Sequence, residues 1–190
     1  MNNYFDQNDE SLKWQQGQIK SLLNTCVFEV TSQHNTSSTN VEGDYIILNA
    51  RDWVIVIAKK DENFLMVKQW RHGERKLSIE FPGGVIDKGE EPEAAAKREL
   101  EEETGYKAGK LTKLGSLNPN PALFSNHIHI FLAEDLVATG EQHLDNDEFV
   151  NYLEIPIKEV VENMGTEFFH HSLMGTALCL YLKKMLSSEN

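Results

Sequence analysis

Short apolar runs recur along the chain at spacings that predict a sheet. Residues 53–58 read Trp-Val-Ile-Val-Ile-Ala, which is typical of a strand buried on both faces. A polar turn at 60–63 leads to a return strand at 64–70. The pattern predicts further strands at 77–81, 111–117, 127–133 and 150–155, and helices at 157–163 and 172–186. Because strands and helices alternate, we expect an α/β sandwich.

The first 45 residues are more polar than the rest. We predict a short helix at 10–23 that carries Trp14, then a strand at 26–31 and a partner strand at 45–48. The polar residues 32–40 between them predict a loop or a wide hairpin tip. A two-stranded ribbon is marginal in water, so we expect it to pack on something else.

Residues 84–106 join a glycine-rich turn to a helix. Pro92 suits the first helical turn, where its missing N–H has no cost, and three alanines follow at 94–96. Gly105 is placed to end the helix in the left-handed conformation. The predicted helix therefore runs between Pro92 and Gly105.

Like charges crowd one side of this helix. Glu99 and Glu103 are four residues apart and Glu102 lies beside them, a spacing at which like charges repel. Such a cluster is either a solvated acidic face or a site that a cation completes. Carboxylate oxygens are the ligands that Mg²⁺ prefers, together with waters and substrate phosphates.

The spacing of residues 84–106 resembles the Nudix box. Every fixed position of that signature is filled, by Gly84, Glu90, Arg98, Glu99, Leu100, Glu102, Glu103 and Gly105, and Tyr106 is acceptable as the last residue. The resemblance implies the Nudix fold, a mixed β-sheet sandwiched between α-helices. It also implies a metal-dependent hydrolase of phosphoric anhydrides.

Residues outside the box resemble the branch that hydrolyses ADP-ribose and nucleotide sugars. Gln69, Trp70 and Arg71 precede Glu80 as they do in that branch, and Pro121 lies about as far beyond the box as the branch proline. The branch uses its N-terminal strands in a domain-swapped dimer. The resemblance therefore implies an N-terminal β-ribbon extension at 1–48 that dimerises, and a hydrolase domain at 49–190.

The resemblance also implies the metal ligands. Glu99 and Glu103 are the expected direct ligands, with Glu102 beside them and the backbone carbonyl of Gly83 as a further donor. The cofactor is Mg²⁺ or Mn²⁺. We place Arg98 and Glu102 in the catalytic group, and expect Arg98 to pair with Glu90 and orient the loop.

Four residues are candidates for substrate binding: Gln69, Arg71, Glu80 and Pro121. Arg71 is expected to contact the diphosphate, because a guanidinium suits phosphate oxygens; the alternative is an exposed loop arginine. Glu80 either positions substrate or a metal-bound water, or is a strand carboxylate paired with an arginine.

The general base is expected in the acidic loop at 140–148. Glu148 is favoured because it directly precedes the strand at 150–155, and the alternative is an ordinary solvated loop. The other candidates are Glu141, Asp145 and Asp147.

Several aromatic and histidine side chains are candidates for a functional role. Trp14, Trp53 and Trp70 include a possible base-stacking residue, although each more often belongs to a core or an interface. We expect structural roles for His127 and His129, and we interpret His170 and His171 as a solvated helix start.

Composition limits the partners. The net charge of −12 argues against binding the phosphate backbone of nucleic acid or an anionic membrane surface. No apolar run is long enough to span a bilayer, and the polar start does not resemble a signal peptide. Two cysteines give no disulfide framework, so a reducing cytoplasm is the expected location.

The sequence thus predicts Mg²⁺-dependent hydrolysis of ADP-ribose or a related nucleoside diphosphate sugar to a nucleoside monophosphate and a sugar phosphate, by a homodimer. Two alternatives stay open. One is another Nudix pyrophosphohydrolase, acting on nucleoside triphosphates or dinucleoside polyphosphates. The other is a non-catalytic Nudix nucleotide sensor, although such proteins usually lose box glutamates that this chain keeps.

Overall fold

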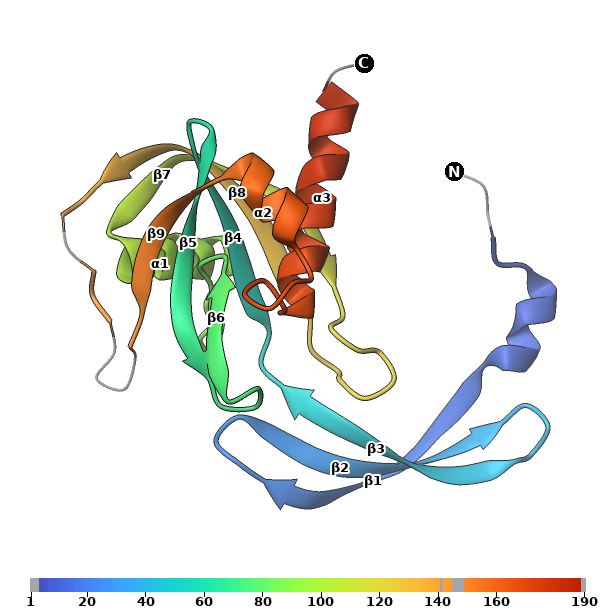
Figure 1. Ribbon diagram of the computed structural model, residues 1–190. Helices are drawn as coiled ribbons and strands as arrows, with labels where there is room; N and C mark the ends of the chain where they lie inside the picture. Colours follow the sequence, from blue (N-terminus) through green and yellow to red (C-terminus); the bar gives the residue numbers. More distant parts are fainter. Residues whose placement is uncertain (1–3, 141, 145–148, 189–190) are drawn as a thin grey trace. The chain divides into compact units, whose positions relative to one another are not determined.

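The computed structural model describes residues 4–140, 142–144 and 149–188 (Figure 1). The chain forms two compact units. The first comprises residues 1–51 together with Asn118–Asn126, and the second comprises Asp52–Leu117 and the chain from His127 onward. The loop at 118–126 therefore belongs with the N-terminal residues, although it lies between two strands of the second unit.

The first unit is a three-stranded antiparallel sheet in the order β1-β2-β3. Its strands are β1 (Trp14–Asn24), β2 (Phe28–Ser37) and β3 (Glu42–Ala50), preceded by the 3₁₀ helix η1 (Gln7–Leu12). The helix predicted at 10–23 is wrong, because most of that segment is strand β1. Gly17 weakens a helix, and here it lets β1 approach the His34 carbonyl of β2, where a Cβ atom would collide.

The predicted loop at 32–40 is also shorter than expected. Residues 32–37 continue β2, with Ser32 opposite Ile46 and Thr36 opposite Glu42 on β3, so the turn is confined to the residues between Ser37 and Glu42. Polar side chains misled the prediction because β2 is the central strand of a sheet on which most positions remain partly exposed.

The second unit contains a mixed sheet in the order β6-β5-β4-β8-β7, with β9 paired to β5. The strands are β4 (Trp53–Lys60), β5 (Asn63–Arg71), β6 (Lys76–Glu80), β7 (Tyr106–Leu117), β8 (Ile128–Ala138) and β9 (Asn151–Pro156). Strands β4 and β8 are parallel and the other pairs are antiparallel. The run at 53–58 is the central strand, as its apolar sequence predicts.

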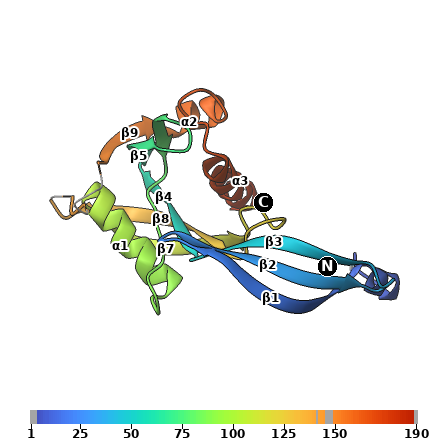
Figure 2. The same cartoon turned by 90° about the horizontal axis from the view of Figure 1, so that it is seen from below.

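Helices cover both faces of this sheet (Figures 1 and 2). Helix α1 (Pro92–Thr104) packs on one face, and α2 (Ile157–Asn163) and α3 (Ser172–Ser188) lie on the other. Alternate residues of β4 serve the two cores: Val54 and Val56 pack with α1, whereas Ile55 and Ile57 pack with α3. The predicted α/β sandwich of a mixed sheet between helices is confirmed.

Candidate active site

A glycine turn connects β6 to α1 and pairs with β4. The N–H of Val54 donates to the Gly84 carbonyl at 2.9 Å, and the N–H of Val56 donates to the Pro82 carbonyl at 2.8 Å. A Cβ atom on Gly83 would collide with the Val54 carbonyl, and φ is +156° at this residue. Close approach of two backbones therefore requires glycine at position 83.

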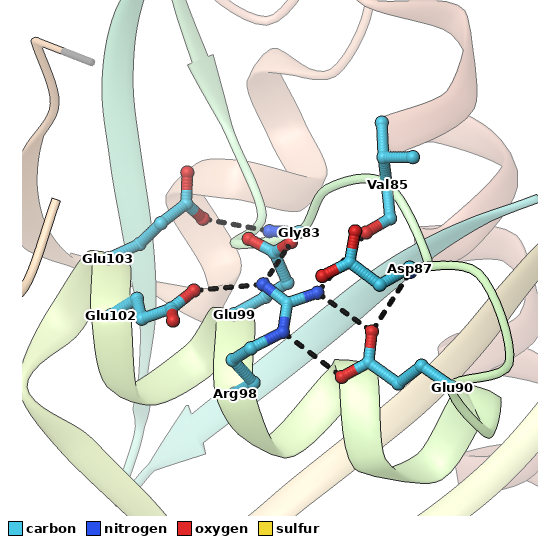
Figure 3. Close-up of polar contacts among 8 residues, drawn as sticks. All are labelled: Gly83, Val85, Asp87, Glu90, Arg98, Glu99, Glu102 and Glu103. Atoms are coloured by element: carbon cyan, nitrogen blue, oxygen red, sulfur yellow. Dashed lines mark hydrogen bonds and ion pairs between the residues drawn. The ribbon is translucent and has the colours of Figure 1, made fainter. Parts of the chain in front are cut away.

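This turn receives two carboxylates from α1. The N–H of Gly83 donates to Glu103 Oε2 at 2.8 Å (Figure 3). The Glu99 carboxylate lies so close to Gly84 that a Cβ atom on Gly84 would overlap it. Both glutamates are buried, with 8% of Glu99 and 4% of Glu103 exposed. The helix ends at Gly105 with φ of 69°, as the sequence predicts.

Arg98 lies at the centre of the remaining carboxylates. Its Nε and Nη2 donate to the two oxygens of Glu90 at 3.0 Å each, and its Nη1 donates to Glu99 Oε1 and Glu102 Oε2 at 2.9 Å each (Figure 3). Its Nη2 also donates to the Val85 carbonyl at 3.2 Å, which ties the turn to the helix. The hydrogen bonds from Arg98 lower the pKa of Glu90, and those bonds in turn raise the pKa of Arg98.

The donor set fits a hard divalent cation. Among the described residues, no three His, Cys, Asp or Glu side chains already converge on a common point; Arg98 holds Glu99 and Glu102, and Gly83 holds Glu103. The chemistry nevertheless matches, because three carboxylates on adjacent turns offer only oxygen ligands. A cation would compete with Arg98 for two of these glutamates.

Arg71 and Glu80 form a second polar cluster next to the first. Strand register places Gln69, Arg71 and Glu80 on the sheet face that carries Leu65 and packs on α1. Arg71 Nε donates to Glu80 Oε1 at 2.8 Å and Nη2 donates to Oε2 at 2.5 Å. Glu80 is thus a strand carboxylate paired with an arginine, which is the second of the two arrangements expected from the sequence. The charge of Glu103 also acts on Arg71, so the two clusters share one electrostatic environment.

His171 is a residue that the sequence interpretation missed. The expected solvated helix start is wrong, because His171 is half-buried and its Nε2 lies 4.0 Å from Glu80 Oε2. His170 is also only partly exposed, with its Nδ1 2.9 Å from the Glu167 carbonyl oxygen. No sequence signal links position 171 to position 80, since the contact depends on how α3 packs.

The other candidate residues are dispersed. Pro121 is exposed and belongs to the first unit. The predicted base Glu148 and its alternatives Glu141, Asp145 and Asp147 lie outside the described residues. His129 pairs with Asp52 at 2.9 Å.

The tryptophans occupy different environments. Trp53 packs against the core of the α3 face, and Trp14 makes an edge-to-face contact with Tyr45 in the first unit. Trp70 is exposed on β5.

A mixed sheet between helices, with a glycine turn against an acidic helix held by one arginine, is the architecture of a phosphoanhydride hydrolase of the Nudix type. A sequence model of the NUDIX domain matches residues 48–173. The chain therefore belongs to the NUDIX family.

Individual relatives agree with this assignment. The chain is 39% identical over 139 residues to the ADP-ribose pyrophosphatase of Bacillus subtilis (strain 168), a match that covers 72% of this chain and 75% of that protein. It is 34% identical over 132 residues to the ADP compounds hydrolase NudE of Escherichia coli (strain K12), covering 68% and 69% respectively. A crystal structure of an ADP compounds hydrolase superposes with a TM-score of 0.82 at 25% identity, covering 94% of this chain and 96% of that one.

Proposed function

We propose that this chain hydrolyses the diphosphate of ADP-ribose or a related nucleoside diphosphate sugar, giving a nucleoside monophosphate and a sugar phosphate. The observation that carries the proposal is the arrangement of Glu99, Glu102 and Glu103 around Arg98 and the glycine turn. The names of the relatives support the substrate class, since one is an ADP-ribose pyrophosphatase and another an ADP compounds hydrolase.

The cofactor in this proposal is Mg²⁺, with Mn²⁺ as its substitute. Glu99, Glu102, Glu103 and the Gly83 carbonyl would hold it. When bound, a divalent cation supplies charge neutralisation for the diphosphate and activation of water. The net charge of −12 supports this requirement, because an acidic protein needs cations between itself and an anionic substrate.

The protein's own groups have separate roles in this reaction. Arg98 keeps the glutamates of α1 in place and orients the turn through Glu90. Arg71 contacts a phosphate of the substrate and stabilises charge on the departing phosphate, with Gln69 on the same sheet face. Glu148 accepts a proton from the attacking water as the P–O–P bond breaks.

We also propose that the chain is a homodimer in which residues 1–48 form the dimerisation extension and residues 49–190 the hydrolase domain. Strand β1 supports this, because every one of its residues is exposed, including Ile19, Leu22 and Leu23. One edge of β1 also lacks a partner strand within the described residues. Apolar side chains on an unpaired edge are normally covered in soluble proteins.

The proposed location is the cytoplasm. Both cysteines, Cys26 and Cys179, are free thiols, which fits a reducing compartment. Across the described residues, the helices are too short or too polar to cross a bilayer.

A panel assay tests the proposed function. The wild-type chain is incubated with Mg²⁺ and ADP-ribose, GDP-mannose, nucleoside triphosphates or dinucleoside polyphosphates. A coupled phosphatase releases phosphate from the products of all substrates except the triphosphates, for which inorganic pyrophosphatase is used because a phosphatase would attack the substrate itself. We expect phosphate release from the diphosphate sugars at rates well above those from the other substrates. Preferential turnover of triphosphates or dinucleoside polyphosphates would support the other Nudix chemistry, and no turnover at all would support a sensor.

A further inference from the structure

The Arg71–Glu80 pair differs from an ordinary surface ion pair because only one of its two partners is exposed. The Glu80 side chain is 1% exposed, whereas the Arg71 side chain is 40% exposed. Two parallel hydrogen bonds fix the plane of the guanidinium against the buried carboxylate. This contact uses two of the five N–H donors of an arginine, so its outer edge can receive another anion.

Glu80 stays ionised in this buried position. Burial opposes ionisation of its carboxyl, but the hydrogen bonds and charge of Arg71 outweigh that cost and lower the pKa of Glu80. A buried carboxylate is stable only when it is paired, so removal of either partner leaves an unpaired buried group. Glu80 therefore depends on Arg71 as its ion-pair partner.

His171 approaches the same carboxylate from the start of α3. The N–H of Leu173 donates to His171 Nδ1 at 3.2 Å, so the neutral ring carries its proton on Nε2. That nitrogen is the one that lies 4.0 Å from Glu80 Oε2, and burial lowers the pKa of His171, which favours the neutral form. The ring thus caps α3 with one nitrogen and directs an N–H dipole toward Glu80 with the other.

Two further contacts fix α3 and the segment before it against β6. The N–H of Phe81 donates to the sulfur of Met174 at 3.1 Å, and the N–H of Ile79 donates to the Phe168 carbonyl at 3.0 Å. The two donor residues, Ile79 and Phe81, flank Glu80 in the sequence. The position of His171 relative to Glu80 is therefore set by several independent contacts.

We infer that Glu80 and His171 are positioning residues for Arg71: Glu80 fixes the guanidinium, and His171 holds the Glu80 carboxylate near Oε2 so that the outer edge of Arg71 is presented to a phosphate of the substrate. This inference rests on the proposed function, since it assigns a phosphate-binding role to Arg71. It goes beyond the family motif, because neither residue belongs to the box.

Asparagine and glutamine at position 171 separate this role from simple helix capping. His171→Asn keeps an acceptor near the position of Nδ1 and hence the cap, but it has no group near the position of Nε2. His171→Gln can place its amide N–H₂ near the position of Nε2, but it is a poorer cap. If His171 acts only as a helix cap, the Gln variant should have the lower melting temperature, and KM should be unchanged in both variants.

The test measures kcat, KM and the melting temperature for wild type, both His171 variants, Glu80→Gln and the control Glu74→Gln, with ADP-ribose and Mg²⁺. Glu74 pairs only with Lys76 among the described residues, in an exposed contact of 3.5 Å. We expect KM to rise about tenfold in Glu80→Gln and about threefold in His171→Asn, with kcat changing less, because Arg71 binds phosphate before and during the reaction. His171→Gln and Glu74→Gln should keep KM within about twofold of wild type.

The outcomes are distinct. Equal KM values for wild type and both His171 variants overturn the inference while leaving the proposed function intact, and this holds even where Glu80→Gln fails to fold. A wild-type chain that hydrolyses no diphosphate sugar overturns the proposed function itself and the inference with it. A higher KM in His171→Asn at an unchanged melting temperature supports the inference.

Discussion

Arg98 shows how one residue organises charge that would otherwise destabilise the helix. Glu99, Glu102 and Glu103 repel one another at their helical spacing. Arg98 binds the first two and also holds Glu90 from the loop, so that one cation serves three anions. The cluster keeps excess negative charge beside the glycine turn, and the proposed metal–diphosphate complex would neutralise this charge.

The pair between Glu90 and Arg98 predicts a pH-dependent contribution to stability. The pKa of Glu90 is lowered from its ordinary value of 4.5 in the folded state. A lowered pKa means that the contribution is fully present above that ordinary value and is lost as the pH falls through the folded pKa. We expect Glu90→Gln to lower the melting temperature at pH 7, and we expect this deficit to shrink as the pH falls below 4.5.

Thermal unfolding followed by circular dichroism at stepped pH measures this difference. Glu93→Gln is the matched control, since Glu93 lies on α1, three residues beyond Glu90, in an exposed pair with Lys97 at 2.7 Å. Exposed pairs contribute little, so the control should change the melting temperature less at every pH. A deficit that does not shrink as the pH falls below 4.5 would contradict the role of the ionised Glu90.

A further prediction at the residue scale concerns the proton acceptor. We expect Glu148→Gln to lose most of kcat, with little change in KM or metal affinity, because a base acts in the transition state rather than in binding. Glu141→Gln and Asp147→Asn should be milder. Steady-state kinetics of the three variants is the measurement, and a crippled Glu141→Gln beside an active Glu148→Gln would move the base to the other end of the loop.

At the scale of elements, the glycine turn determines how α1 meets the sheet. Its backbone pairs with β4 on one side and contacts Glu103 and Glu99 on the other. A side chain at position 83 would push the turn away from β4. The same movement would break the hydrogen bond between the Gly83 N–H and Glu103 of α1. Fold and site therefore depend on the same few backbone atoms.

Gly83→Ala tests that dependence. We expect a loss of about 1–3 kcal/mol in the free energy of unfolding, from the collision with the Val54 carbonyl, and a lower kcat as Glu103 shifts. Gly73→Ala is the control, because a Cβ atom there would meet nothing within 4 Å. Chemical denaturation measures the stability of both, and equal stability would mean that the turn can move without cost.

The elements also show what the sequence could predict. The helix from Pro92 to Thr104 was predictable because its start, its alanines and its terminal glycine are local signals. Strand β1 was not, because its extended form depends on pairing with β2 rather than on its own pattern. The pairing of Arg98 with Glu90 was likewise predictable from the box. The roles of Glu99 and Glu103 as metal ligands stay predictions. The contact of His171 with Glu80 was not predictable, because it depends on packing across 91 positions of sequence.

At the scale of the whole molecule, the two units differ in how they use apolar residues. The second unit buries two clusters around its sheet. The first unit leaves large side chains exposed, among them Ile19 at 61% and Leu23 at 57%. Exposed apolar surface of this extent often marks an interaction site.

We therefore expect a dimeric mass by light scattering at micromolar concentration. Leu23→Glu should shift the mass toward the monomer, because it places a charge in the expected interface. Val137→Glu, at a position 63% exposed on β8 of the second unit, is the matched control and should remain dimeric. A monomeric wild-type chain would contradict the assignment of residues 1–48 as a dimerisation extension.

The central claim concerns which bond is broken, and product analysis tests it most directly. ADP-ribose is incubated with Mg²⁺ and wild type, Glu103→Gln or Glu101→Gln, and the products are separated by chromatography. Glu101→Gln is the control, because Glu101 pairs with Lys107 at 3.0 Å instead of contacting the turn. We predict AMP and ribose 5-phosphate from wild type and Glu101→Gln, and a rate lower by about a hundredfold or more for the folded Glu103→Gln. Release of ADP and free ribose, or an undiminished rate in Glu103→Gln at saturating Mg²⁺, would contradict the account.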